Sequence, residues 1–213
     1  MVLVFFFFIV VLSLFRLGFF LYFHKQMGQL SMDYIMHSFL IGLRFDARLM
    51  ALIILPFLLF TAIPFFRSTT FWKGYWVLTF SCILVMYTAD IFFYAYLNTR
   101  LDATIIGLAK NTAISFKMMW ESYPIILGGI VLFSIIYIFR LIINWVYQIV
   151  TVPNLSARRT VFLYILNLFL ILGVAYGKIS RYPFRWSDAF YSTNHAANQL
   201  AINPVLYFLN TYT

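Results

Sequence analysis

Five long apolar segments constrain the fold of this chain more than any other feature of its sequence. A helix needs roughly 20 mostly apolar residues to cross the hydrocarbon core of a bilayer. Hydrophobic residues make up 64% of the chain and charged residues only 10%, against about 25% charged in soluble domains. The sequence therefore predicts an all-α membrane protein with five transmembrane helices. The expected spans are Val2–Phe23, Leu49–Phe66, Tyr75–Leu97, Tyr123–Val146 and Thr160–Gly177.

The net charge of +9 does not indicate a nucleic-acid-binding protein. Its lysines and arginines occur singly or in pairs, with no run dense enough to follow a phosphate backbone. A basic excess is instead expected in short loops that border a membrane with anionic headgroups. The expected partner is the lipid bilayer, and no nucleic acid.

No motif of a soluble enzyme is visible in the sequence. His24, His37 and His195 stand alone, without a second ligand at the spacing that metal sites use. There is no phosphate-binding glycine loop and no nucleophile elbow, and Cys82 is the only cysteine. The sequence predicts no catalytic residue, metal ligand or cofactor within this chain.

Three charged residues fall inside or near the ends of the predicted spans: Arg16, Asp90 and Arg140. A charge at the bilayer centre costs about 2.5–3.5 kcal/mol on insertion scales. Both arginines are long enough to reach the headgroups from their positions. Asp90 is short, so we expect it to face other helices and either to pair with a base or to hold a polar headgroup. The nearest candidate bases are Arg44, Arg48 and Arg100.

The stretch GLRFDARL, residues 42–49, opens the second predicted span. Arg44 and Arg48 are four residues apart and so share one helix face, whereas Asp46 lies on a different face. Two arginines on one face can grip a lipid phosphate. The alternative is an interfacial helix start whose charges lie in water.

After the fifth span, residues 178–213 are basic, aromatic and rich in asparagine. Ser187 can cap a helix over Asp188–Ile202, and Asn203 with Pro204 can begin a second one. We expect two short helices along the membrane surface that connect the spans to something else. Basic and aromatic side chains would then lie at headgroup level: Arg181, Tyr182, Arg185 and Trp186.

Four motifs resemble one known family. They are GLRFDARL before the second span, ADIFFYAYLNTRLD at the end of the third, a YP pair before the fourth, and YPFRWSDAFYSTNHAANQLAINP after the fifth. Together they resemble the membrane domain of lipoteichoic acid synthase-like proteins, a branch of the sulfatase and alkaline phosphatase superfamily. The resemblance covers essentially the whole chain.

The resemblance implies a large extracytoplasmic catalytic domain that follows the five spans. In the family, that domain binds a divalent metal, usually manganese, and uses a threonine nucleophile. It transfers a phosphoglycerol-type or phosphoethanolamine-type headgroup, or hydrolyses a phosphate or sulfate ester. Residues 1–213 end before those motifs, so we expect a fragment of a longer protein.

Loop charges alone leave the orientation open, because the longer loops hold more bases and also nearly all the acids. The resemblance implies a cytoplasmic N-terminus and an extracytoplasmic tail in a bacterial inner membrane. A small independent transporter or accessory subunit, and a purely structural anchor, are the alternatives. The residues expected to position a headgroup or dock the catalytic domain are Arg44, Arg48, Asp90, Arg100, Asp102, Arg185 and Asp188.

Overall fold

The computed structural model describes residues 2–28, 30–61, 63, 66, 68–108, 125–149, 156–178 and 180–212. Within these residues the chain is helical and contains no strand, so the predicted all-α class is confirmed. The long helices are α1 (Val2–Met27), α2 (Met32–Thr61), α3 (Thr69–Leu97), α6 (Ile125–Ile149) and α7 (Ala157–Tyr176). The short elements are α4 (Thr104–Leu108), the 3₁₀ helix η3 (Trp186–Ala189), α8 (His195–Ala201) and α9 (Pro204–Tyr212).

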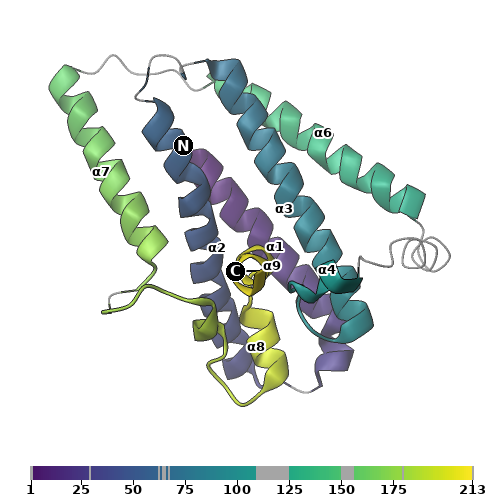
Figure 1. Cartoon of the computed structure of the whole chain (residues 1–213). Coiled ribbons are helices and arrows are strands. Elements are labelled where there is room, and N and C mark those ends of the chain that lie inside the picture. The colour runs from purple at the N-terminus through teal and green to yellow at the C-terminus, as the bar shows by residue number, and fades with distance from the viewer. Residues whose placement is uncertain are drawn as a thin grey trace.

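The five long helices run alternately up and down (Figure 1). α2 packs against α1 on one side and α7 on the other, while α3 packs against α6. After α7 the chain leads to α8, which lies at the end of the bundle opposite to the N-terminus, and then to α9, which is seen near the middle of the view (Figure 1). This arrangement brings residues from both ends of the sequence into one cluster.

Among the described residues, four helices are long and apolar enough to cross a membrane: α1, α3, α6 and α7. α2 does not join them, although it lies beside α1 for much of its length (Figure 1). It carries Arg44, Asp46 and Arg48 within little more than one turn, which breaks its apolar run. A membrane crossing by α2 stays a prediction.

Several helix boundaries differ from those expected. α2 begins at Met32 rather than Leu49 and continues through Pro56 to Thr61. α3 begins at Thr69, since the Ser68 side chain accepts a hydrogen bond from the Phe71 N–H and so caps the helix. Both are polar extensions that a search for apolar runs does not detect. The expected start of the fourth span, at Tyr123, lies outside the described residues.

Aromatic rings hold α1, α3 and α6 together. Phe8 from α1 packs edge-on against Phe80 from α3 and Phe139 from α6, with ring centroids 5.7 and 5.6 Å away. Phe80 and Phe139 stack at 4.0 Å. Large rings fill the space between helices and add dispersion contacts, which matter most where lipid weakens the hydrophobic drive.

The tail is more deeply buried than its sequence suggested. α8 packs against α2 and α1, and α9 packs against α3. Ala197, Leu200 and Ala201 are completely buried, and the buried Ser38 hydroxyl donates to the Ala197 carbonyl at 2.8 Å. The tail is thus part of the bundle core.

The expected single helix over Asp188–Ile202 is wrong. η3 covers Trp186–Ala189, and α8 begins only at His195, where the Asn194 side chain accepts a hydrogen bond from the Ala197 N–H. The second expected start is confirmed: α9 begins at Pro204, and the Asn203 side chain accepts from the Leu206 N–H at 3.1 Å.

Candidate functional site

A buried ion pair joins α1 to α2. The Arg16 guanidinium donates to both carboxylate oxygens of Asp46, at 2.9 and 3.0 Å, and the two side chains are 3% and 0% exposed. Gly42 lies one turn before Asp46, where a Cβ atom would overlap the guanidinium of Arg16. Glycine at this position therefore makes the space that the ion pair occupies.

Arg16 also binds the tail. Its Nη1 donates to the carbonyl oxygens of Leu200 and Ile202. These carbonyls lie at the C-terminal end of α8, where no intrahelical donor remains to satisfy them. A charged donor makes a stronger hydrogen bond than a neutral one. One arginine thus satisfies a carboxylate and a helix end together.

Asn203 and Tyr87 complete this cluster. The Asn203 side-chain amide donates to Asp46 at 2.8 Å and to the Tyr87 hydroxyl oxygen at 3.0 Å. The Tyr87 hydroxyl in turn lies 3.5 Å from the Asp46 carboxylate. Asp46 therefore accepts from α1, α3 and the tail, and its charge is shared among them.

A second buried ion pair lies at the end of α3. Arg100 meets Asp90 at 2.8 Å, with the side chains 3% and 1% exposed. The other oxygen of Asp90 accepts from the Leu101 N–H at 2.9 Å. Arg100 also lies 4.0 Å above the Phe19 ring and donates to the Ile202 carbonyl at 2.9 Å. The prediction that Asp90 pairs with a nearby base is confirmed, and the base is Arg100.

We call these residues the tail clamp: Arg16, Asp46, Tyr87, Asp90, Arg100 and Asn203. Each charge in the clamp has an opposite charge and at least one further hydrogen bond, which offsets part of the penalty for burying ions. The buried Nε atoms of Arg16 and Arg100 have no hydrogen-bond partner among the described residues. The two arginines converge on a single carbonyl, that of Ile202. The clamp can hold a segment in place, and its carboxylates have no free face for acid–base chemistry.

The seven sequence-predicted residues divide into two separate groups. Asp90 and Arg100 belong to the clamp, and Asp102 follows them, where it accepts a hydrogen bond from the Thr104 N–H at 3.0 Å. The others lie near the C-terminal end of α7 and η3: Arg44, Arg48, Arg185 and Asp188. Any role of these seven residues toward a headgroup or a catalytic domain stays a prediction.

The second group centres on Asp188. Its carboxylate pairs with Lys178 at 2.7 Å and accepts from the Arg185 N–H at 2.6 Å, and it lies close enough to stabilise the charge of Arg48. Partial burial alone would raise the pKa of Asp188, but these hydrogen bonds and Lys178 outweigh it and hold the pKa below the ordinary value. Arg185 itself is exposed above the Tyr182 ring.

Sequence reasoning missed the centre of the clamp. Snorkelling of Arg16 toward the headgroups is wrong, since the side chain turns inward to Asp46. The sequence pattern places Asp46 only off the face that carries Arg44 and Arg48, and Asn203 only at a helix start. The available signal was Arg16 inside an apolar span, since a charge at that depth needs a partner; Asp46 lies before the apolar run of the next span and carries no such signal.

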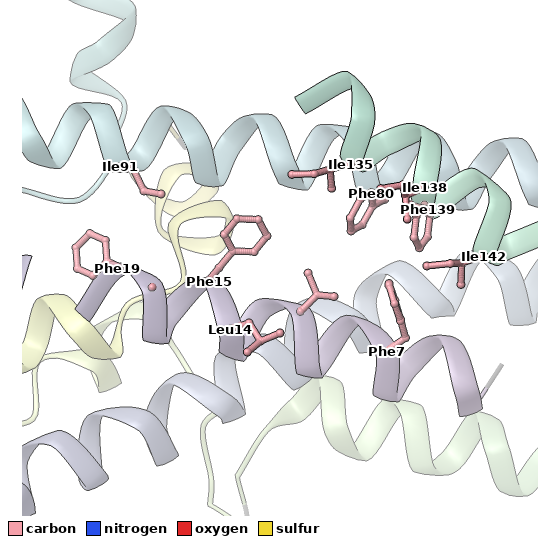
Figure 2. Close-up of a pocket in the computed structure, with 12 residues that line it drawn as sticks. Phe7, Leu14, Phe15, Phe19, Phe80, Ile91, Ile135, Ile138, Phe139 and Ile142 are labelled. Carbon is pink, nitrogen blue, oxygen red and sulfur yellow. The ribbon is translucent and has the colours of Figure 1, made fainter. Parts of the chain in front are cut away.

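An apolar cavity of about 430 Å³ lies between α1, α3 and α6. Figure 2 shows Phe7, Phe15 and Phe19 from α1 along one side of it, with Ile91 from α3 and Ile135 from α6 opposite. The side chains that line it carry no charge.

Nothing in the described residues resembles a metal site, because no three His, Cys, Asp or Glu side chains gather there. The manganese-type ion that the family resemblance implies therefore has no fitting ligand set in this part of the chain. In comparisons with known proteins, no family model, no curated protein and no solved structure matches this chain.

Proposed function

We propose that this chain is the membrane domain of a sulfatase-like enzyme of the lipoteichoic acid synthase type. On this proposal it anchors a phosphoglycerol-type or phosphoethanolamine-type transferase, or a related hydrolase, in a bacterial inner membrane. The N-terminus is cytoplasmic and the tail extracytoplasmic. The substrates are lipid-linked or other envelope molecules, and the divalent metal belongs to the catalytic domain.

One observation supports the anchoring role above the others: Arg16 and Arg100 grip the same carbonyl, that of Ile202, from two different parts of the bundle. A tail that only trailed along the membrane surface would need no such attachment. A clamped tail gives a fixed position and direction to whatever is joined to it. This is what an enzyme needs to meet a substrate at a constant height above the bilayer.

The clamp also favours a positioning role over transport for Asp90 and Arg100. Their charges neutralise each other inside the protein, whereas a transport site offers unpaired groups to a solute. Headgroup positioning or domain docking is proposed for the residues outside the clamp. These are Arg44, Arg48, Asp102, Arg185 and Asp188.

The activity is tested with the full product of the gene. Membranes that contain it receive phosphatidylglycerol or phosphatidylethanolamine with a labelled acyl chain, and labelled diacylglycerol is followed with manganese and with a chelator. We expect metal-dependent release of diacylglycerol, and a reading frame that continues past codon 213 into a catalytic domain. A stop at that codon together with no release would favour the independent transporter or accessory subunit.

The orientation is tested separately with an impermeant thiol reagent on intact cells. Cys82 is replaced by serine, and cysteine is introduced at Arg181 in the tail or at Lys73 near the start of α3. The two positions lie at opposite ends of the bundle, so we expect labelling of Arg181→Cys alone. Labelling of both variants from outside would refute the proposed topology.

A further inference from the structure

A second hollow, between α2 and the C-terminal part of α7, differs from the apolar cavity in its charge. It is a groove of about 710 Å³, within the range of about 300–1,000 Å³ that small-molecule sites occupy. Ala47 and Gly173 leave space in its lining because they are small. A Cβ atom at Gly173 would meet nothing within 4 Å. Phe169, Leu170 and Val174 give it apolar walls.

Two cations line the groove, Arg44 from α2 and Lys178 just after α7. Arg44 is exposed, and its side chain makes no hydrogen bond or ion pair with the described residues. Lys178 forms an ion pair with Asp188, and 30% of its side chain remains exposed. The hydroxyl groups of Tyr176 and Ser180 lie nearby and donate to the Ser180 and Tyr182 carbonyls. Among the described residues, no acidic side chain lines the groove.

We propose that this groove binds a phospholipid whose headgroup carries a net negative charge. An acyl chain lies along Phe169, Leu170 and Val174, and the phosphate contacts Arg44 and Lys178. The pattern fits such a lipid because apolar walls and a basic end match the two halves of an anionic amphiphile. The inference rests on the headgroup-positioning role proposed above for Arg44. Lipid retention is measured without any enzymatic activity, so the two proposals can fail separately.

The geometry also predicts that the bound lipid competes with the tail residue Asp188 for Lys178. Lys178 donates to both oxygens of Asp188, at 2.7 and 3.0 Å, so a phosphate at Lys178 competes with that carboxylate. Neutralising Asp188 should therefore strengthen lipid binding, whereas removing Arg44 should weaken it. Two substitutions at one groove thus have opposite expected effects on the affinity for the anionic lipid.

The experiment uses the full chain purified in detergent, with bound lipid counted by native mass spectrometry. Phosphatidylglycerol and phosphatidylcholine with identical acyl chains are added at equal concentration. A surface cation contributes about fivefold to the affinity for an anionic lipid. We therefore expect Arg44→Ala to retain phosphatidylglycerol about fivefold more weakly, and Asp188→Asn more strongly, than the unmodified chain. Arg140→Ala is the matched control, because Arg140 is exposed on α6, and α6 and α7 lie at opposite edges of the bundle (Figure 1).

A steric variant tests the apolar half of the site. Gly173→Leu fills the groove without a clash at Cβ and should release both lipids, and Ala47→Leu does the same from the opposite wall if the first variant misfolds. Three results would each overturn the proposal. They are equal binding by Arg44→Ala and Arg140→Ala, equal retention of the two lipids, and full displacement of phosphatidylglycerol by inorganic phosphate.

Discussion

The centre of this bundle and its two outer helices, α6 and α7, differ in how many charged side chains they bury. Where α1, α2 and α3 meet the tail, four charged side chains are almost fully buried: Arg16, Asp46, Asp90 and Arg100. In the two outer helices, by contrast, α7 buries only Ile171 and the described side chains of α6 bury only Phe139 and Ile143. The remaining surface of α6 and α7 is largely apolar and exposed, as suits helices that face lipid.

This difference in buried charge explains why the tail docks at one place on the bundle. Lipid chains are as apolar as leucine, so apolar contact alone discriminates poorly between one docking partner and another inside a membrane. Buried polar groups discriminate strongly, because a mismatched partner leaves a charge unpaired. The clamp is thus the specific part of the bundle, and α6 and α7 are its more tolerant part.

The largest effect should come from breaking the clamp at Asp46. Asp46→Ala leaves the buried guanidinium of Arg16 without its carboxylate, and removing one partner of a buried pair costs about 3–5 kcal/mol. We expect a fall of that size in the free energy of unfolding, measured by titration with a denaturing detergent in mixed micelles. Asp33→Ala is the control, since Asp33 is exposed at the start of the same helix. Equal stability of the two variants would mean that the pair contributes little.

A pair of glycine substitutions compares the cost of added volume at the clamp with its cost on the outer helix α6. Gly42→Ala places a methyl group where the Arg16 guanidinium lies, and overpacking of this kind costs about 1–3 kcal/mol. Gly128→Ala on α6 meets nothing within 4 Å, so it should be neutral or slightly stabilising. Thermal unfolding of both variants in the same detergent measures the contrast. A Gly42→Ala protein as stable as Gly128→Ala would show that Arg16 moves aside at no cost.

Asn203 tests the link between the clamp and the tail. Asn203→Ala removes the hydrogen bonds to Asp46 and Tyr87 together with the cap of α9, while Arg16 still satisfies Asp46. We expect a loss of about 1–2 kcal/mol and faster hydrogen exchange in α8 and α9. Exchange in α6 should not change, which makes that helix the internal control. Faster exchange throughout the chain would instead indicate global unfolding.

The fold was predictable where one local rule decides it. Apolar runs of sufficient length located four of the long helices, and the Asn203–Pro204 signature located the start of α9. The part of α2 from Met32 to Ile41 was not predicted, because these residues have no apolar run of sufficient length. Its helix is stabilised by packing on α1 and α8, which is tertiary information.

The site was predictable only in part, for the same reason. Asp90 and Arg100 lie ten residues apart across one helix end, so their pairing follows from local geometry. Arg16 and Asp46 lie on different helices, and their partners in the tail are more than 150 residues away from them in sequence. A hydropathy pattern shows that a buried charge needs a partner. It does not show which of several distant residues supplies it.

The smallest effect should come from Asp188, which is only partly buried. Its pKa is held below the ordinary value of 3.8, so its charge stabilises the fold above that pH, and the stabilisation is lost as pH falls through the lowered pKa. A partly exposed pair with Lys178 contributes no more than about 1 kcal/mol. Asp188→Asn should therefore be slightly less stable than the unmodified chain at neutral pH, and the difference should vanish in strong acid. The difference is measured from the unfolding free energies of both proteins across this pH range, with Asp33→Asn as the control. A difference that persists unchanged in strong acid would assign the effect to packing of η3 instead of charge.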